Sequence, residues 1–368
     1  MSESPSPSPT LQQIAERLGV SKTAVSMALR DQPRISARLK KRVRQTAVAL
    51  GYTPNALVAA HMAHLRSRRT PRYQATLALA LSWSRAQIRQ SVAGDIYRLY
   101  RRGVHERAAQ LGYVIEEFSL DVGAGGLEPA RLAHVLKSRG IHGIVAAPVP
   151  KPGGRLEFAW EDFAAVALGY SIGAPDLHRA CQDAFGGMGC VLAEVSARGY
   201  RRPGLVLARE DDARVNHLAL ARFLAWQRTE SAGEPVPELL LEEQRADIVM
   251  RWFREHRPDV VISSSAQVCG WLREAGIRVP RDAGFASTFW LPVFKGLSGV
   301  YENYDLIGAS AVDMLVGQLH RNERGVPAEP KHTLLPGRWM DGSTLRAGPE
   351  RRGAARKPSE YGTNNTLS

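Results

Sequence analysis

The sequence predicts a small all-α helix-turn-helix domain followed by a two-lobed α/β core of parallel sheets. Residues 10–50 contain three short stretches with apolar residues at helical spacing. Residues 76–345 alternate between short apolar runs and helical stretches, which is typical of parallel strands joined by crossover helices. There are too many such units for one sheet, so two lobes are expected.

The first two helices have the features of a helix-turn-helix. Leu11, Ile14 and Leu18 lie on one face of a helix that Gly19 can end in the left-handed conformation. Ser21 is a natural N-cap for the second helix. A second helix joined by such a turn enters the major groove of DNA. Its early side chains are Lys22, Thr23, Ser26 and Met27.

A third helix is expected after Ser36, which can cap it. Its apolar stripe consists of Leu39, Val43, Ala47 and Leu50. Its outer face carries the basic residues Arg38, Lys40, Lys41, Arg42 and Arg44.

The positive charge of the chain is concentrated on this N-terminal part. Residues 1–72 hold 13 Lys and Arg against 3 Asp and Glu, whereas residues 73–345 hold 31 of each. The tail from Arg346 holds 5 against 2, and the whole chain has a net charge of +13. A basic patch on a helix-turn-helix is suited to neutralising DNA phosphates. The basic residues of the tail, taken alone, could simply be solvent-exposed charges without a binding role.

Three stretches carry a resemblance to a known family. They are Thr10 to Ser26 (Thr-Leu-x-x-Ile-Ala-x-x-Leu-Gly-Val-Ser-x-x-x-Val-Ser), Pro33-Arg34-Ile35-Ser36, and Gly51-Tyr52-x-Pro54-Asn55-Ala56-Leu57. Together they resemble the lac repressor/gal repressor (LacI/GalR) family of transcriptional regulators, and a weaker likeness continues to about residue 345.

The resemblance implies roles for individual residues. Lys22, Thr23 and Met27 match the family's base-reading positions, and Ser21 and Ser26 its phosphate-contacting ones. A hinge helix would run from Asn55 through Leu57 to Met62, with His61 where the family has a leucine that wedges into the minor groove. Because histidine is a poor wedge, either Met62 or Leu57 replaces it or the operator is kinked less, and a solvent-facing His61 stays an alternative. The DNA-binding candidates are Ser21, Lys22, Thr23, Ser26, Met27, Arg34, Asn55, Leu57, His61 and Met62.

The core is expected to consist of alternating strands and helices. The predicted strands are 76–81, 113–118, 143–147, 166–168, 205–208, 239–241, 260–263 and 284–288. The predicted helices are 96–111, 132–139, 184–198, 218–229, 248–256, 267–275 and 305–318.

The landmarks Gly140-Ile141-His142-Gly143-Ile144, Gly199 to Pro203 and Glu274 to Pro280 also match the family's core, which is similar to a periplasmic sugar-binding protein. In such a fold the effector lies in the interlobe cleft, at the carboxyl ends of the strands. The effector-binding candidates therefore follow strands, and they are Trp83, Arg85, Tyr170, Asp183, Asn216, His217, Ser265 and Trp290.

The family's usual sugar anchors are absent from their matching positions. Ala219 stands where the family has an arginine, Ser264-Ser265 where it has Asn-Asp, and Phe289-Trp290 where it has two aspartates. An aromatic-stacking effector of low charge is therefore expected, with Trp83 or Trp290 as a platform or, alternatively, as packing residues. An unusual effector, or none, also stays open.

Other classes of protein find little support in the sequence. No apolar run is long enough for a transmembrane helix, and the Pro/Ser-rich start does not look like a signal peptide. Cys181, Cys190 and Cys269 have no zinc-like spacing and are expected as small buried residues in a reducing cytosol. No catalytic motif, metal site or cofactor is expected. The predicted parts are 1–9 disordered, 10–54 DNA-binding, 55–75 hinge helix and linker, 76–345 effector-binding and dimerisation core, and 346–368 disordered tail.

The sequence thus predicts a cytoplasmic, nucleoid-associated homodimer that binds a near-palindromic DNA operator. It is expected to act as a repressor, to respond to a small molecule such as a sugar or sugar derivative, and not to be an enzyme. Two alternatives stay open. One is a solute-binding module without a DNA role, and the other is a ligand-independent DNA-binding protein.

Overall fold

The computed structural model describes residues 10–29, 35–50, 73–83, 92–120, 126–231 and 233–348. The predicted segments 1–9 and most of 55–75 and 346–368 lie outside these residues. The chain divides into two units by its contacts. The first comprises Met1–Gly186, Arg209–Leu220 and Glu302–Arg338, and the second Gly187–Ala208, Ala221–Tyr301 and Trp339–Ser368.

Three short helices form the N-terminal bundle. They are α1 (Leu11–Leu18), α2 (Lys22–Leu29) and α3 (Ala37–Ala49). Their shared core contains Ile14, Val25, Ala28 and Val43, and none of these four side chains is exposed. The predicted helical stripes are therefore confirmed, because the apolar residues at helical spacing meet in one cluster.

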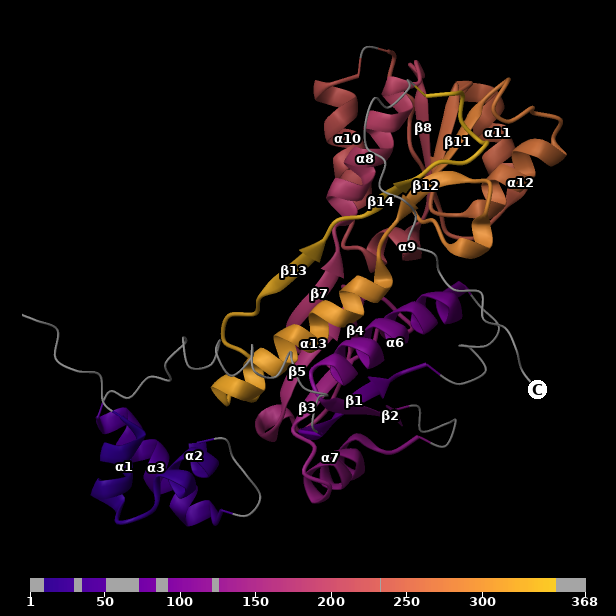
Figure 1. Cartoon of the computed structure of the whole chain (residues 1–368). Helices are drawn as coiled ribbons and strands as arrows, with labels where there is room; N and C mark the ends of the chain where they lie inside the picture. Colours follow the sequence, from indigo (N-terminus) through magenta and orange to yellow (C-terminus); the bar gives the residue numbers. More distant parts are fainter. Residues whose placement is uncertain are drawn as a thin grey trace, which may run out of the picture. The chain divides into compact units, whose positions relative to one another are not determined.

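The first unit contains a six-stranded sheet in the order β13-β7-β5-β3-β1-β2 (Figure 1). Its paired strands run parallel. The strands are β1 (Ala75–Leu81), β2 (Tyr113–Ser119), β3 (Gly143–Ala146), β5 (Ala164–Leu168), β7 (His178–Gln182) and β13 (His332–Leu335). A separate parallel pair is formed by β4 (Gly154–Arg155) and β6 (Ile172–Ala174).

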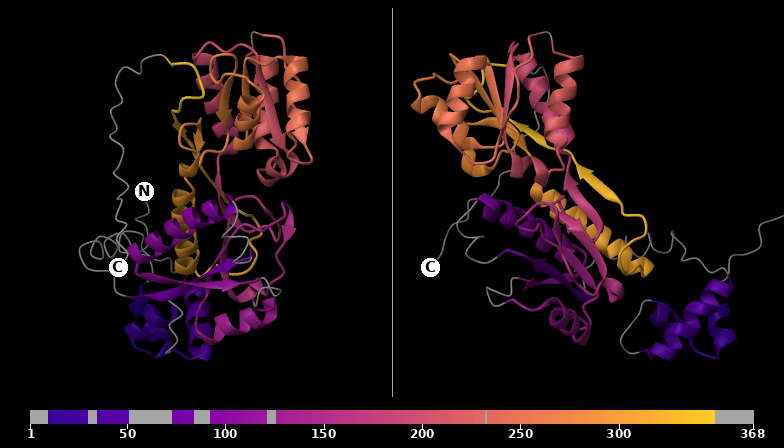
Figure 2. Two further views of the ribbon diagram at one scale, coloured as in Figure 1. Left: turned by 90° about the vertical axis from the view of Figure 1, so that its right-hand side faces the viewer. Right: turned by 180° about the vertical axis from the view of Figure 1, so that it is seen from behind.

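Helices cover both faces of this sheet. Ala78 and Ala80 of β1 pack in one cluster with α7, whereas the side chain of Leu77 lies beside Gly143 together with leucines of α13. Alternate residues of a strand point to opposite faces, so α7 covers one face and α13 the other. Figure 2 shows α6 and α13 side by side. The helical elements of this unit are α6 (Val92–Gln110), α7 (Pro129–Ser138), η2 (Trp160–Asp162), α9 (Arg209–Arg214) and α13 (Tyr304–Arg321).

The α6–α13 contact depends on two glycines. A Cβ atom added to Gly103 would lie 1.8 Å from the backbone oxygen of Asp305, and one added to Gly308 would lie 2.4 Å from that of Tyr100. Neither glycine has a positive φ, so the requirement is close approach of the two backbones and not an unusual conformation. The ion pair Arg102–Asp305, at 3.1 Å, joins the same two helices.

The second unit contains a six-stranded sheet in the order β14-β12-β11-β10-β8-β9. Val206, Val261 and Phe285 of its strands pack against α11 and α12, and α8 and α10 lie on the other face (Figure 1). The strands are β8 (Pro203–Ala208), β9 (Leu239–Leu241), β10 (Val260–Ser263), β11 (Gly284–Ser287), β12 (Ser298–Tyr301) and β14 (Arg338–Met340). The helical elements are α8 (Ala184–Ala197), α10 (Leu218–Thr229), α11 (Ala246–His256), α12 (Ala266–Glu274) and η3 (Pro292–Phe294).

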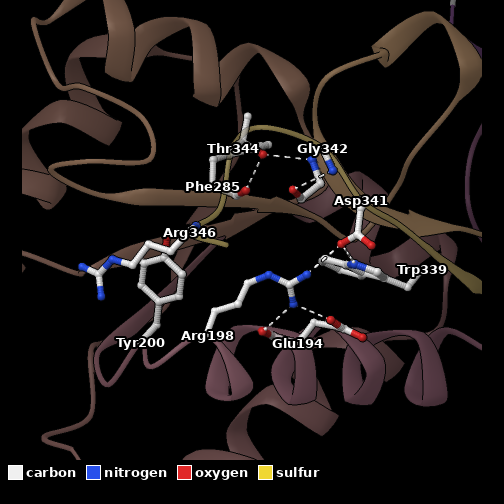
Figure 3. A network of polar contacts seen from close by, with 10 residues as sticks. Glu194, Arg198, Tyr200, Phe285, Trp339, Asp341, Gly342, Thr344 and Arg346 are labelled. Atoms are coloured by element: carbon white, nitrogen blue, oxygen red, sulfur yellow. Dashed lines mark hydrogen bonds and ion pairs between the residues drawn. The ribbon is translucent and has the colours of Figure 1, made fainter. Parts of the chain in front are cut away.

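Side-chain contacts hold the segment after β14 against the second unit (Figure 3). The Arg198 guanidinium donates to Asp341 at 2.7 Å and lies over the Trp339 ring. Thr344, fully buried, donates its hydroxyl to the carbonyl of Phe285 at 2.8 Å. The backbone of Arg346 donates to the Tyr200 hydroxyl at 3.0 Å, so the chain stays part of the second unit at least to Arg346.

The two parallel sheets and every predicted core strand and helix are confirmed, with ends shifted by a few residues. The sequence analysis missed four elements of the two main sheets and one helix. Strand β7 was not predicted, and its sequence His-Arg-Ala-Cys-Gln contains polar residues that the fold buries. In fact Arg179 is buried and donates to Asp176 and to the carbonyl of Ile172, and His178 accepts from the backbone of Lys331. The other missed elements are β12, β13, β14 and α9.

Candidate nucleic-acid interface and effector site

The helix-turn-helix is shaped by hydrogen bonds of neighbouring residues. The Thr10 hydroxyl accepts from the backbone of Gln13, whose side chain accepts from the Thr10 backbone, and this forms a capping box. Gly19 has φ 65° and ends α1 in the left-handed conformation. The Ser21 hydroxyl accepts from the Ala24 backbone at 3.1 Å. The left-handed Gly19 and the Ser21 cap confirm the predicted end of α1 and the predicted start of α2.

The turn leaves the early residues of α2 available to a ligand. Lys22 and Thr23 are exposed, and Ser26 and Met27 are half-buried. Val25, between them, is part of the core. The predicted reading residues therefore lie on the outer side of α2.

The third helix contributes charge beside this surface. Ser36 caps it by accepting from the Leu39 backbone at 3.3 Å. Arg38, Lys41 and Arg42 are exposed. Among the predicted site residues, Arg34, Asn55, Leu57, His61, Met62 and Arg85 lie outside the described residues.

In the first unit, the Trp83 indole is oriented by a hydrogen bond from its N–H and by a guanidinium group over its ring. Its indole nitrogen donates to the carbonyl of Pro148 at 2.7 Å. The Arg214 guanidinium lies 6.0 Å from the ring centre and itself donates to the carbonyls of Val149 and Pro150. Glu210 accepts from the same guanidinium at 2.8 Å. The half-buried indole therefore has a fixed orientation at the carboxyl ends of β1 and β3.

Sequence reasoning missed Arg214. The expected arginine position is Ala219, which is buried at 8% exposure. Arg214 belongs to α9, a short polar helix without an apolar stripe. Only its place beside Trp83 makes it a candidate site residue, and the sequence carried no signal for that.

Asn216 and His217 follow α9 in an unusual turn. Both are exposed, with φ of 56° and 59°. The imidazole Nδ1 of His217 lies 2.6 Å from a carboxylate oxygen of Asp212, a residue only 3% exposed. This His–Asp pair holds a backbone conformation that costs free energy outside glycine, and it fixes His217 at the surface.

Tyr170 and Asp183 follow β5 and β7 in the same unit. Tyr170 is half-buried, and burial raises the pKa of its phenol. Burial also raises the pKa of the neighbouring Cys181 thiol to about 12, so that thiol is un-ionised at neutral pH. Asp183 accepts from the Gly186 backbone at 2.8 Å in the first turn of α8. Its carboxylate is thus engaged by its own helix.

Ser265 and Trp290 belong to the second unit. The Ser265 backbone donates to the Ser263 hydroxyl at 3.1 Å. The Trp290 indole donates to the carbonyl of Leu297 at 3.0 Å, and its ring meets Tyr301 edge-on at 6.2 Å. Trp290 is half-buried and bonded within its own unit. Trp83 and Trp290 are therefore fixed separately, each by neighbours in its own unit.

The N-terminal bundle and the two α/β units define a class of protein, a helix-turn-helix regulator with a periplasmic-binding-protein-like core. The sequence matches the bacterial regulatory proteins of the lacI family over residues 10–55 and the periplasmic binding protein-like domain over residues 192–345. The chain belongs to the lac repressor/gal repressor family and is a DNA-binding transcriptional regulator.

Solved structures share this fold at low sequence identity. The "lac repressor dimer bound to operator and the anti-inducer ONPF" matches with a TM-score of 0.54 and 19% identity over 93% of this chain and 100% of that one. The "transcriptional regulator CelR-cellobiose complex" matches with a TM-score of 0.53 and 19% identity over 91% of this chain and 99% of that one.

A "periplasmic binding protein/LacI transcriptional regulator from Alkaliphilus metalliredigens QYMF complexed with D-xylulofuranose" matches with a TM-score of 0.52 and 14% identity over 74% of this chain and 99% of that one. None of the curated protein sequences matches this chain. Among the described helices, none is both long and apolar enough to cross a membrane.

Proposed function

We propose that this regulator is a homodimeric repressor that binds a near-palindromic operator. Binding of a small molecule raises or lowers its affinity for that operator. The observation that carries the proposal is the capped α2 with Lys22 and Thr23 exposed at its start. Residues at this position of a helix-turn-helix reach base edges. The operator-bound dimer among the similar structures supports the same reading.

Binding-site selection from random duplexes tests the DNA-reading part. The wild-type chain should select two inverted half-sites. Lys22→Ala should relax the preference at particular base pairs, at a cost of about 1–3 kcal/mol per lost base contact. Arg42→Ala, the matched control on α3, should weaken all duplexes alike. Equal affinity of the wild-type chain for all duplexes at about 0.15 M salt would contradict the proposal.

For the effector, we propose a carbohydrate or similar hydroxyl-rich molecule that stacks on an aromatic ring. Trp83 supports this, because its indole is oriented by Pro148 and Arg214 before any ligand arrives. Pre-oriented aromatic rings lose little conformational entropy on binding. The remaining effector candidates, from Tyr170 to Trp290, stay proposals. Cellobiose and D-xylulofuranose, present in two similar structures, support the carbohydrate class.

Tryptophan fluorescence tests this assignment. Titration of the full chain with a panel of sugars, starting from those two, should change the emission. Trp83→Phe should abolish the change, whereas Trp271→Phe, on α12 of the second unit, should retain it. A response that survives Trp83→Phe in full would remove Trp83 from the site.

We also propose that the chain has no catalytic activity and acts on nucleoid DNA in the cytoplasm. Its family supports this, because the members are regulatory proteins. Hydrolysis or modification of the effector in a stoichiometric mixture with the purified chain would contradict the first part.

A further inference from the structure

The short helix α9 and the turn that follows it belong to the first unit by their contacts, although the chain on either side of them belongs to the second unit. Arg209–Leu220 is part of the first unit, whereas Gly187–Ala208 and Ala221–Tyr301 are parts of the second. A helix of six residues is not stable by itself, so α9 depends on contacts with the residues around it.

Arg214, the last residue of α9, makes such contacts with the loop after β3. Its Nη1 donates to the carbonyl of Val149 at 3.0 Å, and its Nη2 donates to the carbonyl of Pro150. The guanidinium also lies over the Trp83 ring. Glu210, one helical turn earlier, accepts from Nη2 at 2.8 Å. The Arg214 side chain is 26% exposed, so these contacts are partly shielded from water.

The loop that receives Arg214 is itself held in place by side chains of the first unit. The N–H of Val149 donates to the hydroxyl of Ser171 at 3.0 Å, and the two residues are 5% and 2% exposed. The Trp83 indole donates to the carbonyl of Pro148 at 2.7 Å. Val149 is therefore bonded on two sides, to Ser171 through its N–H and to Arg214 through its carbonyl. This path of hydrogen bonds joins the loop after β5 to α9.

Helix α9 docks through polar groups and not through an apolar face. Its sequence, Arg-Glu-Asp-Asp-Ala-Arg, has no apolar stripe, and Asp212 is its buried residue. The Asp212 carboxylate is engaged by His217 of the same segment, so that pair does not tie α9 to the rest of the unit. Water can take the place of the partners in a polar contact at a small net cost. The segment can therefore open without unfolding of the sheet beside it.

We propose that Arg214 is a releasable clasp. It docks Arg209–Leu220 on the loop after β3 and couples the order of α9 to the order of that loop and of Trp83. The guanidinium bridges two carbonyls and a ring with its planar fork, which a single ammonium group cannot reproduce. Such coupling is reciprocal. A ligand that orders Trp83 therefore also favours the docked α9, and this last consequence rests on the proposed effector site.

Hydrogen–deuterium exchange of the full chain, without DNA or effector, tests the clasp. Wild-type peptides covering residues 209–217 should be protected. Arg214→Ala should raise their exchange about tenfold or more, because charge-assisted hydrogen bonds are lost. Arg214→Lys should restore the protection only in part, and it replaces the alanine variant if that one does not fold. Arg228→Ala, which removes an exposed arginine of α10, is the matched control and should exchange as wild type.

Ser171→Ala tests the coupling, because it removes the acceptor of the Val149 N–H without touching α9. In the wild-type background it should raise the exchange of residues 209–217. In the Arg214→Ala background it should add nothing to that exchange, because the path from the loop to α9 is already broken. If Ser171→Ala does not fold, as judged by circular dichroism, Trp83→Phe, which removes the donor to Pro148, takes its place in the same cycle.

Three results would overturn the proposal. They are an unprotected wild-type segment, unchanged protection in Arg214→Ala, and a loop substitution whose effect on residues 209–217 is absent or is the same in both backgrounds. Since no effector is present, these results decide on the clasp whether or not a sugar binds. A failed sugar titration would count only against the proposed effector.

Discussion

At the scale of single residues, buried polar side chains of this protein are held by specific partners, and Thr344 is a clear example. Its hydroxyl donates to the Phe285 carbonyl and accepts from the Ser298 backbone at 2.9 Å. An apolar side chain of the same shape would leave the Phe285 carbonyl and the Ser298 N–H without this hydrogen bond. Each unsatisfied buried polar group lowers the free energy of unfolding by about 1–3 kcal/mol.

Thr344→Val should therefore destabilise the second unit by about 1–3 kcal/mol. Chemical denaturation of the two variants measures this. Thr344→Ser, which keeps the hydroxyl and loses one methyl group, should cost less than the valine variant. The opposite order would mean that methyl packing, and not the hydrogen bonds, holds the segment after β14.

His61 supports a second prediction at this scale, drawn from the sequence. His61→Leu restores the apolar wedge of the family's hinge helix and should increase operator bending and affinity, because an apolar side chain offsets unstacking better. Gel mobility of permuted operator fragments reports the bend. If neither bend nor affinity changes, the wedge lies elsewhere, and Met62→Ala should be the damaging substitution.

At the scale of elements, the helices α6 and α13 of the first unit cross with their backbones in close approach. Gly103 allows it, since a Cβ there would overlap the backbone of Asp305. Backbone atoms cannot move aside as a flexible side chain can, so a methyl group must push the helices apart. That loosens the packing around Tyr100 and Tyr304 as well.

Gly103→Ala should therefore lower the free energy of unfolding by about 1–3 kcal/mol or more. Gly270→Ala is the matched control, because Gly270 lies inside α12 with open space where its Cβ would be. There alanine should stabilise by about 0.5–1 kcal/mol through helix propensity. Thermal melts of both variants decide the matter, and a neutral Gly103→Ala would refute the close-contact argument.

At the scale of the whole molecule, charge separates the DNA-binding part from the core. Residues 1–72 carry 13 basic and 3 acidic residues, while 73–345 are balanced at 31 each. Phosphate contacts made by the basic part release counterions. The core has no net charge of its own to add to that attraction.

Affinity for DNA should therefore fall steeply with salt, by about 10³–10⁵ between about 50 and 200 mM if 6–10 phosphates are contacted. Fluorescence anisotropy on an operator and on an unrelated duplex measures both slopes. Arg42→Ala should make each slope shallower by about one. A slope near zero on both duplexes would rule out phosphate neutralisation as the source of affinity.

Interactions between near neighbours in the chain were accessible from the sequence. The caps at Ser21 and Ser36 and the left-handed Gly19 each involve residues within five positions of one another. Strand–helix alternation with parallel pairing follows from apolar periodicity in the same way. For this reason the bundle, the two sheets and the residues at the start of α2 could be predicted.

Contacts between distant residues required the tertiary structure. Arg214 reaches Trp83, the Tyr304 ring meets Tyr100 edge-on, and the buried Arg179 of β7 became recognisable only with its partners in place. The identity of a polar residue does not reveal which distant carbonyl group or aromatic ring it will contact in the folded chain. The sequence by itself therefore determined the kind of protein and its DNA-reading helix, whereas the fold decided which side chains orient Trp83 and which carbonyl accepts from the buried Arg179.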